Sequence, residues 1–255
     1  MKKGEVYTGT VERMDFPNRG IVTIDGETAV VKNALPGQVV TFAITKKRGG
    51  RFEGRLLQVE KDSPLEKTEG RCAHFGVCGG CLCQSLPYEE QLKIKEAQIR
   101  RLMDGVCQGD YSFEGILGSP LPEGYRNKME FSFGDAYKGG PLELGMHRRG
   151  SFHDVVSAEG CRIVHEDFSR ILAETRAYFA DLGVGFYRKL QHTGYLRHLL
   201  VRRAVKTGEI LTALVTTGQN GLLPANPGES AEEAERRILE EWEQRLRKLP
   251  LEGHF

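Results

Sequence analysis

Three closely spaced cysteines place the strongest constraint on how this chain can fold. Cys72, Cys78 and Cys81 occur in the stretch RCAHFGVCGGC, and Cys161 lies eighty residues further on. Three local thiolates with one remote thiolate are typical of a four-cysteine metal site, and the Gly-Gly pair before Cys81 lets the backbone fold closely around the metal. We therefore expect distant segments of the chain to meet at one metal centre.

Two other uses of cysteine have to be weighed against a metal site. Reduced cysteines can be buried as small hydrophobic side chains, and secreted chains form disulfides. The N-terminus, MKKGEVYTGTVERM, lacks the apolar region of a signal peptide, and no stretch approaches the ~20 apolar residues of a membrane span. We therefore expect a cytoplasmic protein with no membrane partner, in which disulfides are rare.

The spacing favours an iron–sulfur cluster over zinc. The first gap of five residues exceeds the usual C-x2-4-C zinc pair, whereas the second pair would suit either metal. A [4Fe–4S] cluster is the form that four thiolates would hold. Zinc stays open as the alternative.

The fourth ligand is expected to be Cys161, because the preceding Gly160 allows a close approach of the backbone. Cys83 and Cys107 compete for this position. Cys83 lies only two residues after Cys81, which makes ligation of the same iron awkward, and Cys107 closes a predicted helix. His74 lies inside the cysteine loop but is not needed beside four thiolates.

Residues 1–61 are predicted to form a small barrel of the OB type. Alternating apolar residues indicate five strands over 6–11, 20–24, 28–31, 39–44 and 52–59, and Asp25-Gly26 is a strong hairpin signal. A mobile basic loop between the last two strands would suit RNA phosphates, although a solvated hairpin tip would look the same. Its charged residues are Lys46, Lys47, Arg48 and Arg51.

Residues 62–255 are predicted to form a second, α+β domain that carries the cysteines. Helices are expected over 87–103, 167–182 and 229–248, and strands over 125–133, 142–148, 152–156, 196–205 and 209–217. The length of 255 residues allows one large or two smaller domains. The formal net charge of +1 decides nothing about nucleic acid, because basic residues gather in short clusters and acids concentrate toward the C-terminal end.

Together these motifs resemble the TRAM-containing, iron–sulfur class of RNA uracil-5-methyltransferases. The most specific segments are CAHFGVCGGC with the remote Cys161, GYRNKMEFSF at 124–133, and LGMHRRGSFHDVV at 144–156. The resemblance covers nearly the whole chain. It implies a β plus α+β fold with a TRAM barrel, a central domain with an iron–sulfur site, and an RNA substrate, either ribosomal or transfer RNA.

The resemblance also implies a C-terminal Rossmann-like domain that binds S-adenosylmethionine. In that family a cysteine attacks C6 of uracil, C5 takes the methyl group and a carboxylate removes the C5 proton. All six cysteines of this chain lie before position 162, and no Gly-rich cofactor turn is readable. We therefore expect the catalytic domain to be missing from this chain, to act in cis in the parent enzyme, and to leave this part inactive alone.

Two basic motifs are the remaining candidates for contacts with RNA. They combine charge with an aromatic face, as recognition of single-stranded RNA requires. Tyr125 could instead pack in a core, and Arg126 could pair with Glu130. A further basic region covers Tyr195, Arg197, His198, Arg202 and Arg203 with the same ambiguity. The two motifs consist of Tyr125, Arg126 and Lys128, and of His147, Arg148 and Arg149.

Three other functions compete with the methyltransferase interpretation. A stand-alone RNA-binding protein with a metal-stapled core would have the same sequence features and no catalysis. A radical S-adenosylmethionine enzyme would use C-x3-C-x2-C and place its barrel at the other end of the chain. An electron carrier of the ferredoxin type would be smaller and would not need a basic barrel.

Overall fold

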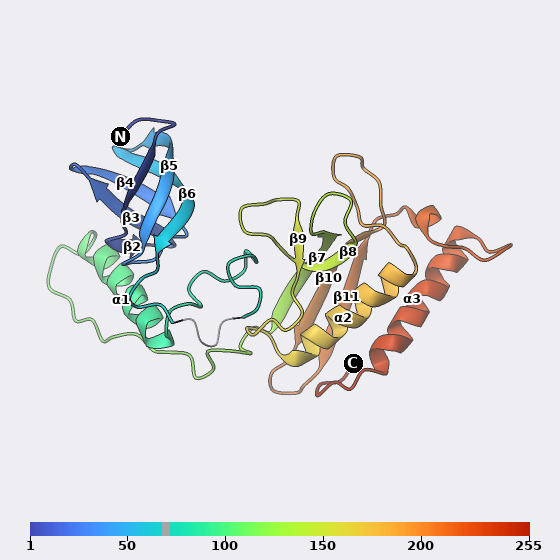
Figure 1. The fold of residues 1–255 in the computed structure, drawn as a ribbon. Helices are drawn as coiled ribbons and strands as arrows, with labels where there is room; N and C mark the ends of the chain where they lie inside the picture. Colours follow the sequence, from blue (N-terminus) through green and yellow to red (C-terminus); the bar gives the residue numbers. More distant parts are fainter. Residues whose placement is uncertain (68–71) are drawn as a thin grey trace. The chain divides into compact units, whose positions relative to one another are not determined.

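The computed structural model describes residues 1–67 and 72–255, which divide into two compact units (Figure 1). The first unit combines Met1–Arg71 with Leu82–Pro120, and the second combines Cys72–Cys81 with Leu121–Phe255. The cysteine-rich stretch therefore packs with the later part of the chain. The predicted domain boundary after residue 61 stays a prediction.

The first unit is built on a six-stranded sheet in the order β1-β5-β6-β4-β3-β2. Neighbouring strands are antiparallel except β4 and β6, which run parallel. The strands are β1 (Val6–Thr10), β2 (Arg13–Asp15), β3 (Arg19–Ile24), β4 (Glu27–Lys32), β5 (Val39–Arg48) and β6 (Arg51–Lys61).

The predicted fold class is wrong in its five-stranded barrel, because a sixth strand, β2, follows the first predicted strand. β1 pairs with β5 at one end of the sheet order and β2 pairs with β3 at the other. The change of partner occurs between Val11, whose N–H donates to the carbonyl of Gln38, and Glu12, whose N–H donates to the carbonyl of Ile21. Consecutive segments therefore supply the two ends of the sheet and close it on itself.

The interior of this barrel is packed with side chains. Val22, Val31 and Phe42 are completely buried, and each such side chain contributes about 1.5–3 kcal/mol by leaving water. Gly54 in β6 is needed for this packing, because a Cβ atom there would lie 2.7 Å from the ring of Phe42. The barrel is therefore filled by side chains.

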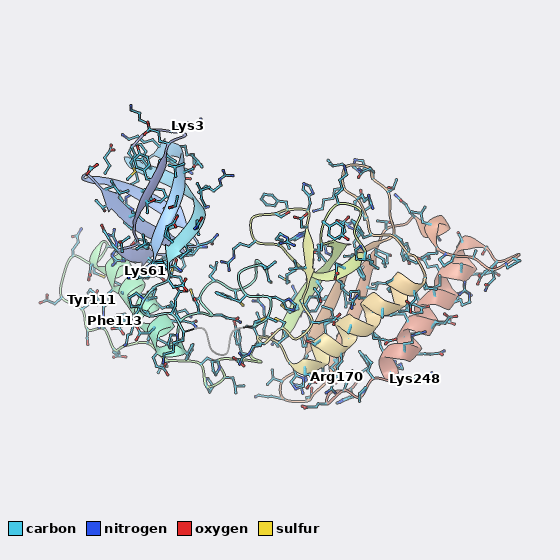
Figure 2. All side chains as sticks on the ribbon, viewed as in Figure 1. Lys3, Lys61, Tyr111, Phe113, Arg170 and Lys248 are labelled. Carbon is cyan, nitrogen blue, oxygen red and sulfur yellow. The ribbon has the colours of Figure 1, made fainter. Side chains whose placement is uncertain are left out.

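Helix α1 (Tyr88–Asp104) packs beside β2 in the same unit. Pro87 precedes its first turn, where the missing N–H costs nothing. The buried amide of Gln98 donates to the carbonyl of Met14 at 3.1 Å. Figure 2 shows the segment after α1 returning along the helix with Tyr111 and Phe113 toward it, and the guanidinium of Arg100 lies 4.1 Å from the Phe113 ring centroid.

The second unit contains a five-stranded antiparallel sheet in the order β11-β10-β7-β8-β9. Gly145 in β8 allows β9 to approach, because a Cβ atom would lie 2.0 Å from the carbonyl oxygen of Val156. The strands are β7 (Lys128–Asp135), β8 (Leu142–His147), β9 (Val155–Ser157), β10 (Leu196–Arg203) and β11 (Ile210–Thr216).

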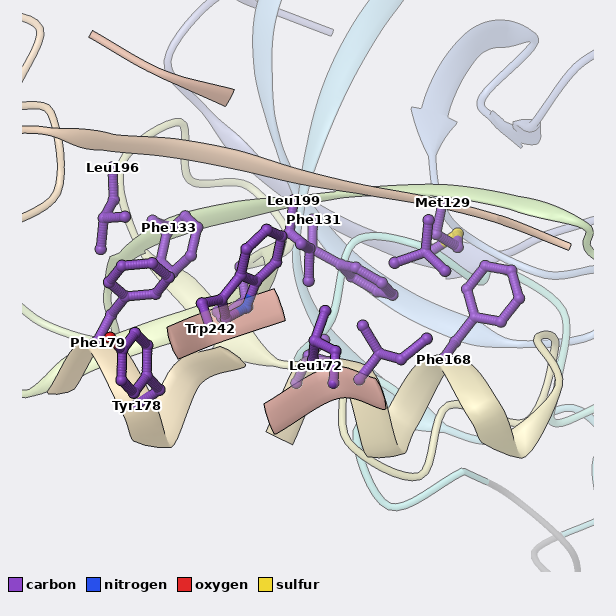
Figure 3. Close-up of a cluster of buried hydrophobic side chains, with 14 of the residues drawn as sticks. Met129, Phe131, Phe133, Phe168, Leu172, Tyr178, Phe179, Leu196, Leu199 and Trp242 are labelled. Carbon is purple, nitrogen blue, oxygen red and sulfur yellow. The ribbon is translucent and has the colours of Figure 1, made fainter. Parts of the chain in front are cut away.

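Two helices cover one face of this sheet and enclose the largest core of the molecule (Figure 3). They are α2 (Glu166–Asp181) and α3 (Ala231–Arg247), and the short 3-10 turn η1 (Asn220–Leu222) precedes α3. Phe131 and Leu199 from the sheet meet Phe179 and Trp242 from the helices. The Trp242 indole N–H donates to the hydroxyl of Thr175 at 3.1 Å, so its polar atom is satisfied inside the core.

The helices and strands expected from the sequence occur in the structure with ends that differ by a few residues. The helix expected over 167–182 is α2 and that expected over 229–248 is α3, which begins with a capping box between Ser230 and Glu233. Within residues 1–67 and 72–255, no helix combines the length and apolar character needed to span a membrane.

The predicted fold class is also wrong in containing an assembled metal site. Among the described residues, no three side chains of His, Cys, Asp or Glu are gathered closely enough to hold a metal ion. The physical reason lies in the packing of the thiols. Cys81 and Cys161 lie against the hydrophobic core of the second unit as partly buried side chains.

A buried carboxylate joins three segments of the second unit. Asp167, in the first turn of α2, is 1% exposed and accepts hydrogen bonds from the N–H groups of Glu252 and Gly253 at 3.0 and 3.1 Å. One of its oxygens also accepts from the guanidinium of Arg203 at 3.3 Å. Burial alone would raise the pKa of Asp167, but these N–H donors, His165 and Arg203 lower it below its usual value.

We expect Asp167→Asn to lower the free energy of unfolding at pH 7 by about 2 kcal/mol, because Arg203 is left without its charged partner. A carboxyl group whose pKa is lowered by folding stabilises above its unfolded value of about 3.9, and this contribution disappears as the pH falls through the folded value. The difference between variant and wild type should therefore shrink below about pH 4. Urea unfolding between pH 7 and pH 3 measures it.

The matched control is Glu166→Gln, which neutralises the adjacent carboxylate. The Glu166 side chain is 67% exposed and pairs with Arg170, so its substitution should change the unfolding free energy by less than about 0.5 kcal/mol. Equal effects of the two substitutions, or an Asp167→Asn effect independent of pH, would contradict this account of the buried carboxylate.

Candidate functional site

The cysteine stretch forms a tight loop that docks on the end of β8. Within the loop, the N–H groups of Phe75 and Cys78 donate to the carbonyls of Cys72 and His74 at 2.9 and 2.8 Å. Cys78 forms an antiparallel bridge with Arg148, and the N–H of Gly79 donates to the carbonyl of His147 at 2.9 Å. A Cβ atom on Gly79 would lie 3.0 Å from that carbonyl oxygen, so this position needs a small residue.

Two side chains connect the loop to neighbouring segments of the second unit. The guanidinium of Arg149 donates to the carbonyl of Cys81 at 2.6 Å and lies 5.7 Å from the Phe75 ring centroid. Its Nε is buried without a hydrogen-bond partner among the described residues. The Nε2 of His74 donates to the carbonyl of Glu159 at 2.7 Å, which connects the loop to the segment that carries Cys161.

The four cysteines predicted as ligands come from this loop and its neighbouring segment. Burial, together with the charges of Cys161, Cys78 and Cys72, raises the pKa of the Cys81 thiol to about 11, although Arg126 acts in the opposite direction. Burial also raises the pKa of Cys161, whereas hydrogen bonds from the N–H groups of Ile163 and Val164 lower it. The charges of Cys72 and Cys78 therefore reach the Cys81 and Cys161 thiols, although among the described residues the four cysteines do not form a ligating group.

The two competing cysteines lie in the first unit. Cys83 packs against the small cluster of Met14, Leu35 and Leu86, and Cys107 follows the end of α1, where its N–H donates to the carbonyl of Met103 at 2.8 Å.

The basic residues predicted in the barrel lie on a regular hairpin. Gly49 and Gly50 have φ values of 56° and 76°, as a two-residue turn between β5 and β6 requires, so the charged residues lie on the strands rather than in a loop. The Lys46 ammonium is 3.3 Å from the Glu53 carboxylate, and the Lys47 ammonium is 4.9 Å from the Phe52 ring centroid.

The two ends of this hairpin turn carry arginines that face each other. Arg48 is paired in register with Arg51, whose guanidinium lies 3.8 Å from the carboxylate of Asp15. Among the described residues, Arg48 takes part in no ion pair. The end of the hairpin therefore carries a net positive charge, because the neighbouring carboxylates neutralise only part of its basic residues.

The segment 124–128 lies beside the Cys161 segment. The N–H of Arg126 donates to the carbonyl of Ile163 at 2.8 Å, and Arg126 forms a parallel bridge with Val164. Tyr125 is 51% exposed rather than part of the core, and the side chains of Arg126 and Lys128 are exposed. No ion pair joins Arg126 to Glu130 within the described chain.

The third basic motif has a mixed character. His147 is exposed at the end of β8, and the guanidinium of Arg148 lies 3.8 Å from the Asp154 carboxylate. Arg149 is used to hold the cysteine loop. The structure therefore brings residues 72–81, 124–128, 147–149 and 161–164 together in the second unit, and it leaves the basic hairpin in the first unit.

The further basic region divides between the interior and the surface. Tyr195 is completely buried and donates its hydroxyl to Glu235 at 2.6 Å, and Arg203 binds Asp167. Arg197 and Arg202 are exposed. Two further residues, Tyr187 and Lys189, lie in the loop before β10 and were not among the residues predicted to contact RNA. The signal that identifies this loop is that residues 182–208 contain no Asp or Glu.

Comparisons with known proteins identify relatives of this chain and a solved structure with a similar fold. No protein-family model matches the chain. Proteins named uncharacterized RNA methyltransferase, from Clostridium tetani and from Caldanaerobacter subterraneus subsp. tengcongensis, are each 44% identical over 219 residues, which is 86% of this chain and 48% of the relative. A third, from Bacillus cereus, is 31% identical over 217 residues. The chain is a relative of RNA methyltransferases.

A solved structure resembles the fold of this relative of RNA methyltransferases. The Pyrococcus abyssi tRNA (uracil-54, C5)-methyltransferase, solved with S-adenosyl-L-homocysteine, matches with a TM-score of 0.61 at 18% sequence identity. The match covers 86% of this chain and 47% of that protein. The chain spans about half the length of the curated relatives it matches.

We expect Arg149→Ala to loosen the cysteine loop, because it removes the hydrogen bond to the Cys81 carbonyl and the interaction with Phe75. A decrease of about 1–2 kcal/mol in local stability raises the open fraction of the loop roughly five- to thirtyfold. Hydrogen exchange of the Gly79 amide should accelerate by that factor. The control is Arg148→Ala, which removes a long ion pair at the surface and should leave this exchange rate nearly unchanged.

Proposed function

We propose that this chain is the RNA-recognising part of an S-adenosylmethionine-dependent RNA methyltransferase that acts on C5 of uracil in ribosomal or transfer RNA. The observation that carries the proposal is the fold likeness to the tRNA (uracil-54, C5)-methyltransferase over 86% of this chain, since the curated relatives over the same extent are named RNA methyltransferases. A cytoplasmic location is part of the proposal.

The barrel of the first unit would take the part of a TRAM domain. Its hairpin of β5 and β6 ends in Lys47, Arg48 and Arg51, which suit the phosphates of an RNA backbone. The second unit adds Tyr125, Arg126 and Lys128 and the exposed side chain of His147. A target uracil has to leave its stack to be methylated, so the enzyme needs surface that holds RNA away from the reacting base.

S-adenosylmethionine would supply the methyl group to the whole protein. We assign none of the described residues of this chain to the cofactor or to the catalytic cysteine and base. The proposal therefore includes that residues 1–255 alone bind RNA and transfer no methyl group, and that the catalytic residues act from elsewhere in the whole protein.

The four cysteines of the second unit are proposed as ligands of an iron–sulfur cluster. Burial and the charges of Cys72 and Cys78 raise the pKa of the Cys81 and Cys161 thiols, which indicates that the four cysteines lie in one part of the second unit. In the described part of the chain the thiols are not gathered into a ligating group. Binding would therefore require the loop to tighten and the thiols to release protons, so part of the binding free energy would stabilise the fold.

We expect residues 1–255 to bind a fluorescein-labelled single-stranded RNA with an affinity that falls as salt rises. Lys47→Ala with Arg48→Ala should weaken binding several-fold and reduce the slope of log K against log salt by about 0.7 for each phosphate that is no longer neutralised. The control is Lys2→Ala with Lys3→Ala, which removes two exposed charges from the same unit (Lys3 in Figure 2). Fluorescence anisotropy from about 50 to about 300 mM salt provides both quantities.

Two results of this titration would count against the proposal in different ways. An absence of RNA binding at the lowest salt would refute the RNA-recognising function. Binding that both double variants leave unchanged would remove the hairpin from the interface.

A separate assay tests the inactivity expected for this part alone. Methyl transfer by residues 1–255 to RNA would contradict it.

For the metal, we expect about four iron and about four acid-labile sulfide per chain after strictly anaerobic purification. Cys161→Ser should lower the iron content and the melting temperature, because a metal held only by the folded state stabilises it. Cys107→Ser, in the first unit, is the matched control and should leave both unchanged. One zinc without sulfide, or full iron retention in Cys161→Ser, would reject the proposed ligand set.

A further inference from the structure

One face of the sheet in the second unit is left open by the helices. Leu199 and Val201 in β10 pair with Phe131 and Met129 in β7, and all four are buried beneath α2 and α3. Because side chains alternate along a strand, the pairs between these point to the opposite face. Those pairs are His198 with Ser132, Leu200 with Glu130, and Arg202 with Lys128.

This open face places like charges directly opposite each other. Arg202 and Lys128 are register partners, and both side chains are exposed. Like charges in a direct cross-strand pair destabilise a sheet, and an anion bound between them would remove that cost. Glu130 is the only acidic residue in the three outward pairs.

Positive charge continues into the loop between α2 and β10, which is orange in Figure 1. Residues 182–208, which comprise this loop, β10 and the turn after it, contain six Lys and Arg and no Asp or Glu, and two of the six, Arg188 and Lys189, lie in the loop. Arg203 of this segment is bound to buried Asp167. Across the described residues, Lys189, Arg197 and Arg202 take part in no ion pair, so their charges are available to a ligand.

The loop has a fixed conformation that presents an aromatic ring and a guanidinium together. The Gln219 side chain accepts from the N–H of Gly194 at 3.1 Å and donates to the carbonyl of His192 at 2.8 Å. The guanidinium of Arg197 lies 5.4 Å from the Tyr187 ring centroid. A guanidinium plane held against a tyrosine gives an unstacked base a flat surface on which to stack.

His198 lies where the loop and the sheet face meet. Its Nδ1 is 3.4 Å from the Ser132 hydroxyl. Burial lowers the pKa of His198; Glu130 opposes this effect, whereas Arg197, Lys189 and His147 reinforce it. These groups face His198 from β7, β8, β10 and the loop, and the two cations among them are Arg197 of β10 and Lys189 of the loop.

We propose that this open face, with His198 and Arg202 on the sheet, Arg197 at the bulge in β10 between Leu196 and His198, and Lys189 in the adjacent loop, binds a single-stranded segment of RNA. Lys189 and Arg202 contact phosphates, and the pair of Arg197 and Tyr187 stacks against a base. The inference deepens the proposed function and rests on it. RNA is the occupant that the charges favour, because a protein partner would have to be strongly acidic and would leave the stacking surface without a role.

The test uses residues 1–255 and a single-stranded oligouridine of about 12 nucleotides, within the length that one binding module covers, with a duplex of the same length for comparison. Lys189→Ala with Arg202→Ala should weaken binding of the single strand roughly tenfold and reduce the salt slope by about 1.4, or about 0.7 for each phosphate. The control is Arg236→Ala with Lys248→Ala on and after α3 (Lys248 in Figure 2), which removes two exposed charges from the helix side of the unit.

A second variant separates stacking from charge. Arg197→Lys keeps the positive charge and removes the planar guanidinium, so it should weaken binding roughly fivefold and leave the salt slope unchanged. Because this substitution is conservative and lies at an exposed position, it keeps the test valid if the double variant unfolds. Equal melting temperatures establish that each variant is folded.

The outcomes distinguish this inference from the proposed function. If the wild-type chain binds no RNA, the proposed function and the inference both fail. If it binds RNA and the open-face variants bind as well as wild type, the inference fails alone and a protein partner becomes the better occupant. Equal weakening of duplex binding would overturn the single-strand assignment.

Discussion

The burial of one side of the second sheet is the constraint on which the rest of that unit depends. Strands β7 and β10 alternate apolar and polar residues, and α2 and α3 cover only the apolar side. The four buried strand residues and the aromatic rings of the helices exclude water from this layer and supply most of its stability. A one-residue shift of register would bring Lys128 and Arg202 into the core, so the same pattern that fixes the register also fixes which charges face solvent.

The cysteine loop depends on this sheet for its position. Its backbone continues the pairing of β8 through the contacts with His147 and Arg148, and it reaches the Cys161 segment through His74. Arg149 stabilises the loop where the backbone turns away from the strand. Segments that are distant in sequence therefore meet because each one pairs with the chain next to the end of a strand of the same sheet, the cysteine loop at β8 and the Cys161 segment at β7. This arrangement brings the predicted ligands near one another even though, in the described part of the chain, they do not form an assembled metal centre.

The positions of most helices and strands could be predicted from the sequence, because alternation and helical periodicity reflect burial directly. The number of strands in the barrel could not be predicted, because the break between β1 and β2 occurs where the N–H groups of Val11 and Glu12 donate to different strands or loops, at Gln38 and Ile21. The spacing of the cysteines and the glycine before Cys161 predicted a set of metal ligands, and this set stays a prediction. The use of Arg149 was not predictable, because an arginine that holds a loop and one that binds RNA have the same local sequence.

The charge distribution of the second unit follows from the same one-sided burial. Helix α3 carries six glutamates and four arginines, whereas residues 182–208 carry six basic residues and no acids. Helix α3 lies on the covered face of the sheet, and Arg202 points from the opposite face. The acidic helix and the basic face are therefore separated by the sheet and the hydrophobic core beneath α3. A net charge of +1 averages over this separation. The resulting field would orient an approaching polyanion toward the open face and away from the helices, which is an effect on encounter rate and orientation more than on affinity.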